Sequence, residues 1–144
     1  MPSNELLTLH SDKCSECEYV RENIERFRSS CFGEAGAQVV YLELSHLTAQ
    51  AWNWMLPHYL RFCISDEAKN ESTLTAFFLY QFYPVQKLSQ LISHKLFSLN
   101  MDQFLCLAHF LTWALNDPIR RDEDGEDIKD SITFLKELIQ SRTT

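Results

Sequence analysis

The stretch LELSHLTAQAWNWMLPHYLRFCI, residues 42–64, combines a helix start, a dense aromatic cluster and a proline inside a helical pattern. Thr48 is a good N-cap, because its hydroxyl can accept a hydrogen bond from a backbone N–H of the first helical turn. Apolar residues then recur at helical spacing and predict one buried face: Trp52, Met55, Leu56, Tyr59, Leu60 and Cys63. Pro57 removes a backbone N–H from this pattern, so we expect either two short helices that meet at the proline or a bend that shapes a cleft.

The composition favours helices around this stretch. The chain has 144 residues, of which 45% are hydrophobic, with only 3 glycines and 4 prolines. So few turn-forming residues leave little scope for an all-β protein. We therefore expect a mainly α protein, a compact multi-helix orthogonal bundle folded as a single domain over residues 1–144. Residues 38–44, rich in β-branched and aromatic side chains, allow at most one short strand or an extended link.

Further helix signals flank the central stretch. Apolar residues follow Cys14 at intervals of three and four, which predicts an amphipathic helix. Asn100 and Gln103 have the spacing of a capping box at the start of another. Asn116, Asp117 and Pro118 should end that helix, and the charged residues 117–127, with Gly125 among them, are predicted to form a mobile acidic linker before a last helix.

Charge and apolar runs narrow the functional classes. The net charge of −7 argues against a nucleic-acid partner, since phosphate recognition normally requires a basic face, and fits a basic partner better. The N-terminus lacks the pattern of a signal peptide, and the most apolar run is too short to span a bilayer. We expect a cytoplasmic protein with no membrane partner. Five cysteines without a repeated spacing argue against a secreted disulfide framework.

Cys14 and Cys17 form a CxxC motif at the start of a predicted helix. Backbone amides there can favour a thiolate, so a redox pair is one interpretation, although Glu16 and Glu18 oppose it. A zinc site is another, with His10, Cys14 and Cys17 as three ligands, but a structural site usually needs four. From sequence we favour the interpretation that both are ordinary structural cysteines. If the protein binds a cofactor, we expect it to be zinc.

Two surfaces are candidates for binding a protein partner. Trp54 shares a helix face with His58 and Arg61 rather than with the apolar stripe, and tryptophan and arginine are favoured interface anchors. The second candidate surface is acidic and would steer a basic partner; it comprises Asp122, Glu123, Asp124 and Glu126.

Three segments resemble a family of small bacterial helical proteins classed only as a domain of unknown function. They are CSECEYVRENI with its CxxC, LTAQAWNWMLPHYLRF with the pattern LT…A…LPxYL, and LFSLNMDQFLCLAHFLTWAL with the pattern LxxxQ…FL. Residues 31–40 depart from the family, where a tryptophan-containing linker would be expected. The resemblance implies a compact helical fold and supplies no catalytic residues.

The sequence lacks a complete catalytic motif such as GxSxG, HExxH or a P-loop. Our leading hypothesis is a non-enzymatic interaction protein, such as an immunity protein that binds and neutralises a basic toxin. The alternative is a redox or zinc-binding module that uses the Cys14 and Cys17 pair.

Overall fold

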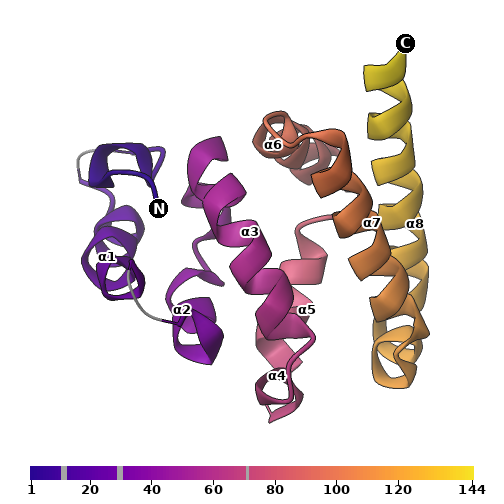
Figure 1. Ribbon diagram of the computed structural model, residues 1–144, viewed down its shortest axis with the longest axis horizontal. Coiled ribbons are helices and arrows are strands. Elements are labelled where there is room, and N and C mark those ends of the chain that lie inside the picture. The colour runs from indigo at the N-terminus through magenta and orange to yellow at the C-terminus, as the bar shows by residue number, and fades with distance from the viewer. Residues whose placement is uncertain (11–12, 29–30, 71) are drawn as a thin grey trace. The chain divides into compact units, whose positions relative to one another are not determined.

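The computed structural model describes residues 1–10, 13–28, 31–70 and 72–144. Every regular element in these ranges is a helix, and the only β-type pairing found there is an isolated antiparallel bridge between Thr8 and Leu47 (Figure 1). The prediction of a mainly α, multi-helix protein is confirmed. The chain divides into two compact units, Met1–Phe78 and Leu79–Thr144, which we describe separately. The expectation of a single domain stays a prediction.

The first unit contains three short 3-10 turns and most of the α-helices. The 3-10 turns are η1 (Asn4–Leu6), η2 (Glu25–Phe27) and η3 (Leu44–His46). The α-helices are α1 (Ser15–Ile24), α2 (Gly33–Val40), α3 (Ala49–Cys63), α4 (Glu67–Asn70) and α5 (Ser72–Tyr80), the last of which runs into the second unit.

Helix α3 begins where the sequence predicts. Thr48 is the N-cap, and its Oγ1 accepts a hydrogen bond from Ala51 N at 3.1 Å. The prediction of two short helices meeting at Pro57 is wrong, because α3 continues unbroken through the proline to Cys63. Pro57 is exposed, whereas the opposite face of α3 is buried. Burial of that face stabilises the helix beyond what local propensity allows, and so offsets the cost of the proline.

The core of the first unit is aromatic. The Tyr59 and Phe78 rings are stacked with centroids 4.5 Å apart, and Trp52 lies against the same Phe78 at 6.2 Å. The polar ends of both side chains have backbone partners, because Tyr59 Oη donates to Leu74 O at 3.0 Å and Trp52 Nε1 donates to Leu44 O at 2.9 Å. Buried Trp and Tyr normally need such partners. The Trp52 bond fixes the segment that precedes α3, which carries part of the site described below.

The expectation of a strand or extended link over residues 38–44 is wrong. Gly33–Val40 form α2, and turns followed by η3 complete the segment. The residues Gly36, Ala37, Val40 and Leu44 have helical spacing and are all buried. Because β-propensity mainly reflects how a side chain fits a half-buried sheet, the burial of this helical face prevails over it.

The second unit contains α6 (Gln86–Leu96), α7 (Met101–Asn116) and α8 (Pro118–Thr143). The predicted capping box is present at the start of α7: Gln103 N donates to Asn100 Oδ1, and Asn100 N donates to Gln103 Oε1, each at 2.9 Å. Helices α7 and α8 lie side by side and antiparallel (Figure 1).

The predicted acidic linker at residues 117–127 is also wrong, because Pro118 begins α8 and residues 118–127 are its first ten residues. Asp117 is the N-cap and its Oδ1 accepts hydrogen bonds from Ile119 N and Arg120 N at 3.0 and 3.1 Å. Proline is well tolerated at the first helical position, where its missing N–H has no intrahelical partner to lose. The same dipeptide that ends α7 therefore starts α8.

Candidate metal centre

Two segments far apart in sequence run side by side at the start of the chain and before α3. Leu9 N donates to His46 O at 2.8 Å, and Thr48 N donates to Leu7 O at 3.0 Å. Thr48 Oγ1 also donates to Leu6 O. Thr48 thus caps α3 and holds the N-terminal segment, and the pairing brings His10 next to His46, whose ring centroid lies 5.8 Å from that of His10.

Helix α1 supplies the two thiols. Cys14 is its N-cap residue with an extended backbone, and Cys17 lies in the first turn, completely buried. Residues three apart lie on the same face of a helix, so both sulfur atoms point to one side of α1. Ser15 and Glu18 have the spacing of a capping box, but Cys14 rather than Ser15 occupies the N-cap position, and it makes no side-chain cap bond.

These elements bring together the three residues that the sequence nominated. The ligand atoms of His10, Cys14 and Cys17 all lie within 4.8 Å of one another, and Cys17 Sγ is 3.5 Å from His10 Nδ1. A second trio shares Cys14 and adds Glu16 and His46, again within 4.8 Å of one another. Sequence reasoning missed His46 and Glu16 as members of this cluster. Thiolate and imidazole are the ligands that zinc prefers in tetrahedral sites.

The electrostatics of the cluster do not favour a free thiolate. The largest single effect on the pKa of Cys14 is a lowering by the backbone N–H of Cys17. The Cys17 thiol, desolvation and the Glu16 carboxylate all raise this pKa, and together they outweigh the lowering, so the pKa of Cys14 lies above its ordinary value. Glu16 accepts hydrogen bonds from the Cys14 thiol at 3.5 Å and the Ser15 hydroxyl at 3.0 Å. Its own backbone N–H, Ser15 and Cys14 lower the pKa of Glu16, and His46 adds to this effect.

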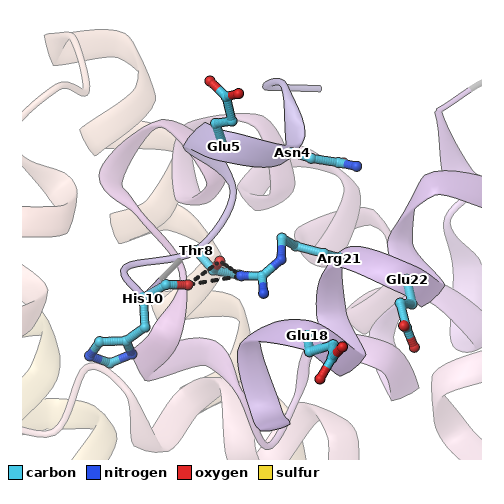
Figure 2. Close-up of a pocket in the computed structure, with 7 residues that line it drawn as sticks. All are labelled: Asn4, Glu5, Thr8, His10, Glu18, Arg21 and Glu22. Carbon is cyan, nitrogen blue, oxygen red and sulfur yellow. Dashed lines mark hydrogen bonds between the residues drawn. The ribbon is translucent and has the colours of Figure 1, made fainter. Parts of the chain in front are cut away.

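Arg21 of α1 fixes the backbone next to the first histidine. Its guanidinium donates to Thr8 Oγ1 at 2.7 Å and to His10 O at 2.8 Å (Figure 2). The guanidinium forms part of a pocket of about 480 Å³, with Glu18 and Glu22 among its other lining residues. Figure 2 shows the His10 imidazole directed away from Arg21, so the arginine holds the backbone of His10 while its ring stays available to the cysteines.

The predicted aromatic surface has a buried base. Trp54 and His58 are half-buried on α3, and both rings lie against Phe32, with centroids 6.2 and 5.9 Å from it. Trp54 and His58 are also 5.4 Å apart. Desolvation, followed by the charge of Arg61, lowers the pKa of His58, whereas Arg61 itself is exposed. Sequence reasoning did not identify Phe32 as part of this surface.

The predicted acidic residues lie on the first turns of α8 and are partly neutralised there. Glu123 and Glu126 pair with Arg120 and Lys129, at 3.8 and 2.5 Å. Asp122 lies 3.6 Å from the guanidinium of Arg121. Asp124 faces Tyr83, whose pKa is raised by burial and then by the carboxylates of Asp124 and Asp127. The acidic surface is therefore helical and partly neutralised, which reduces its value for steering a basic partner.

Comparison with known protein families identifies the family of this chain. The model of a family of unknown function, DUF6714, matches residues 36–134, which is more than half of the chain. The chain belongs to this family. Among curated proteins and among solved structures, no significant match was found. Within the part of the chain that the structure describes, no helix has the length and apolar character needed to cross a bilayer.

The DUF6714 match divides the candidate sites. His46, the aromatic surface around Trp54 and the acidic residues of α8 lie inside the matched residues 36–134. His10, Cys14 and Cys17 precede them, so the CxxC segment of the sequence resemblance lies outside the DUF6714 match, whereas the two other segments lie within it. Since the function of the family is unknown, membership supplies no activity for any of these candidate sites.

Proposed function

We propose that this protein is a zinc-binding helical module in which His10, Cys14 and Cys17 hold the ion. One observation carries the proposal: these three ligand atoms lie within 4.8 Å of one another. In a tetrahedral site with zinc–sulfur bonds of about 2.3 Å and zinc–nitrogen bonds of about 2.0 Å, ligand atoms are separated by roughly 3.5 Å. The distance of 3.5 Å between Cys17 Sγ and His10 Nδ1 already has this value.

The electrostatic surroundings of the cysteines favour zinc over the redox alternative. A reactive thiol requires a lowered pKa, whereas the surroundings of Cys14 raise it. A zinc ion reverses this balance, because its charge favours deprotonated thiols. The positive ion also offsets the repulsion between the two thiolates and the nearby carboxylates of Glu16 and Glu18.

The experiment measures zinc content and its effect on stability. After purification without chelator, we expect about one zinc per chain by elemental analysis, and a lower Tm once a strong chelator has removed the metal. C14S and C17S should each lose most of the zinc, whereas C106S should keep it, because Cys106 is an exposed cysteine of the other unit. Wild-type protein that takes up no zinc at neutral pH, and whose Tm is unaffected by chelator, would overturn the proposal.

A second proposed function keeps the predicted protein interaction and is supported by the half-buried rings on α3. Trp54 and His58 rest on buried Phe32 next to exposed Arg61, and a rigid aromatic surface with an arginine at its edge is typical of interface anchors. A bacterial source, a cytoplasmic location and the role of an immunity protein against a basic toxin belong to this proposal.

Calorimetric titration with a basic toxin encoded beside this gene tests it. We expect W54A to weaken binding about 30-fold or more, since losing a central aromatic anchor costs at least about 2 kcal/mol. W113A is the matched control, because Trp113 is likewise accessible but belongs to α7. Equal affinity of the wild type and W54A would remove Trp54 from the interface, and no binding by the wild type would reject that toxin as the partner.

A further inference from the structure

We infer that His46 is the fourth protein ligand and that the site is a closed Cys2His2 zinc centre, which links the N-terminal segment and α1 to the start of α3. This inference rests on the proposed zinc function and assigns a structural role to the site. His46 lies within ligand distance of Cys14, at most 4.8 Å, and its ring is 5.8 Å from that of His10. The two trios of ligands share Cys14 but do not form one group of four within 4.8 Å, so a shared ion next to Cys14 requires the His46 ring to turn toward His10 and Cys17.

The backbone keeps His46 in place independently of any metal. Its carbonyl accepts Leu9 N at 2.8 Å, and the next residue, Leu47, forms the bridge with Thr8. His46 also ends η3, whose first residue, Leu44, accepts the Trp52 indole N–H. Because this backbone is already fixed, only the side chain of His46 has to reorganise to bind a metal.

The surroundings of the His46 ring leave one nitrogen for the metal. Ser45 Oγ lies 3.4 Å from His46 Nδ1, so a proton on Nδ1 can be donated to this hydroxyl. The unprotonated Nε2 then carries the lone pair that a metal needs. Ligating histidines are commonly oriented by such a hydrogen bond from the other ring nitrogen.

Glu16 is the competing fourth ligand, and charge and contacts argue against it. Two thiolates and two neutral imidazoles balance the charge of a zinc ion, whereas Glu16 in place of His46 would leave the site with one net negative charge. Its carboxylate is exposed and already accepts the Ser15 hydroxyl at 3.0 Å. Structural zinc sites are built from cysteine and histidine. Glu16 therefore lies outside the ligand set.

A closed site has a consequence for function. Catalytic zinc sites keep one position for water or substrate, whereas four protein ligands leave none. His10 and His46 are 36 residues apart in the sequence, so the ion closes a long loop between two segments that are otherwise paired by a few hydrogen bonds. The metal would stabilise the segment that leads into α3, and the buried face of α3 forms much of the core of the first unit.

The experiment compares three variants by chelator competition for zinc and by the visible spectrum of the cobalt(II) form. H46A should bind zinc about 100-fold more weakly, as expected for loss of one of four ligands, and its cobalt spectrum should lose the intensity of a tetrahedral site. E16Q should change the affinity less than about tenfold. H109A should behave as wild type, because His109 is an exposed histidine of α7.

H46C covers the case in which H46A does not fold. A third thiolate in place of the imidazole should retain zinc and strengthen the sulfur-to-cobalt charge-transfer absorption by about half, since three sulfur ligands replace two. An unchanged charge-transfer band in folded H46C overturns the assignment of His46, as does wild-type affinity in H46A or a large loss in E16Q. In each of these cases the proposed zinc function stands; it fails only if the wild-type chain takes up no zinc.

Discussion

Gly36 of α2 is in contact with the ring of Phe32, so that a Cβ atom at this position would lie 2.5 Å from Phe32 Cδ2. Real Cβ atoms do not approach so closely, and Phe32 has little room to move, because it is 4% exposed and packed between Phe27 and the Trp54 surface. We predict that G36A lowers the free energy of unfolding by about 1–3 kcal/mol, as overpacking typically does. Urea denaturation monitored by circular dichroism measures the change.

Gly125 provides the matched control for this substitution. It lies within α8, and a Cβ there would meet Arg121 Cγ at 3.6 Å, an ordinary contact. Since alanine is favoured over glycine inside a helix, G125A should raise the free energy of unfolding by about 0.5–1 kcal/mol. Equal effects of the two substitutions would mean that contact with Phe32 does not decide the cost at Gly36.

At the scale of elements, the helix starts that could be predicted are those whose signals are local. Thr48 and Asn100 each cap the helix that follows them directly, and both predictions are confirmed. The structures of residues 38–44 and 117–127 are harder to predict from sequence, because their local signals are ambiguous. In the first, Val39 and Val40 favour a strand, although Val40 and Leu44 also have helical spacing. In the second, Asp117 and Pro118 are equally suited to end one helix and to begin another.

The N-cap of α8 yields a prediction that separates a helix from a linker. Asp117 Oδ1 accepts hydrogen bonds from two backbone N–H groups of the first turn, so D117A should lower the free energy of unfolding by about 1 kcal/mol. D117N should retain most of the wild-type stability, because asparagine is also a good N-cap. D122N, which changes an exposed residue in the same acidic segment, should stay within about 0.5 kcal/mol of wild type. If D117A and D122N both had no effect in urea denaturation, an unstructured 117–127 segment would be favoured.

At the scale of the whole molecule, long-range pairing limits what sequence can reveal. His10, Cys14 and Cys17 could be identified as candidates because a window of eight residues contains all three. His46 could not, since its place next to Cys14 depends on hydrogen bonds between residues 6–9 and residues 46–48. Phe32 likewise joins Trp54 and His58 only through the packing of its segment against α3. A mainly α fold follows from composition and helix signals, whereas the complete sites require the tertiary structure.

The pH dependence of stability above neutrality should reflect one buried cation. Lys95 is 2% exposed, and burial lowers its pKa to about 7. Between that value and the ordinary pKa of about 10.4, the unfolded chain holds a proton that the folded chain has released, so the free energy of unfolding rises with pH. We predict that this contribution is on the order of 2 kcal/mol between pH 7 and pH 9, measured as the difference between wild type and K95M in urea denaturation of the metal-free protein. K95M should be the more stable at pH 7, and its advantage should shrink as the pH rises; an advantage that stays constant would show that Lys95 does not titrate in this range.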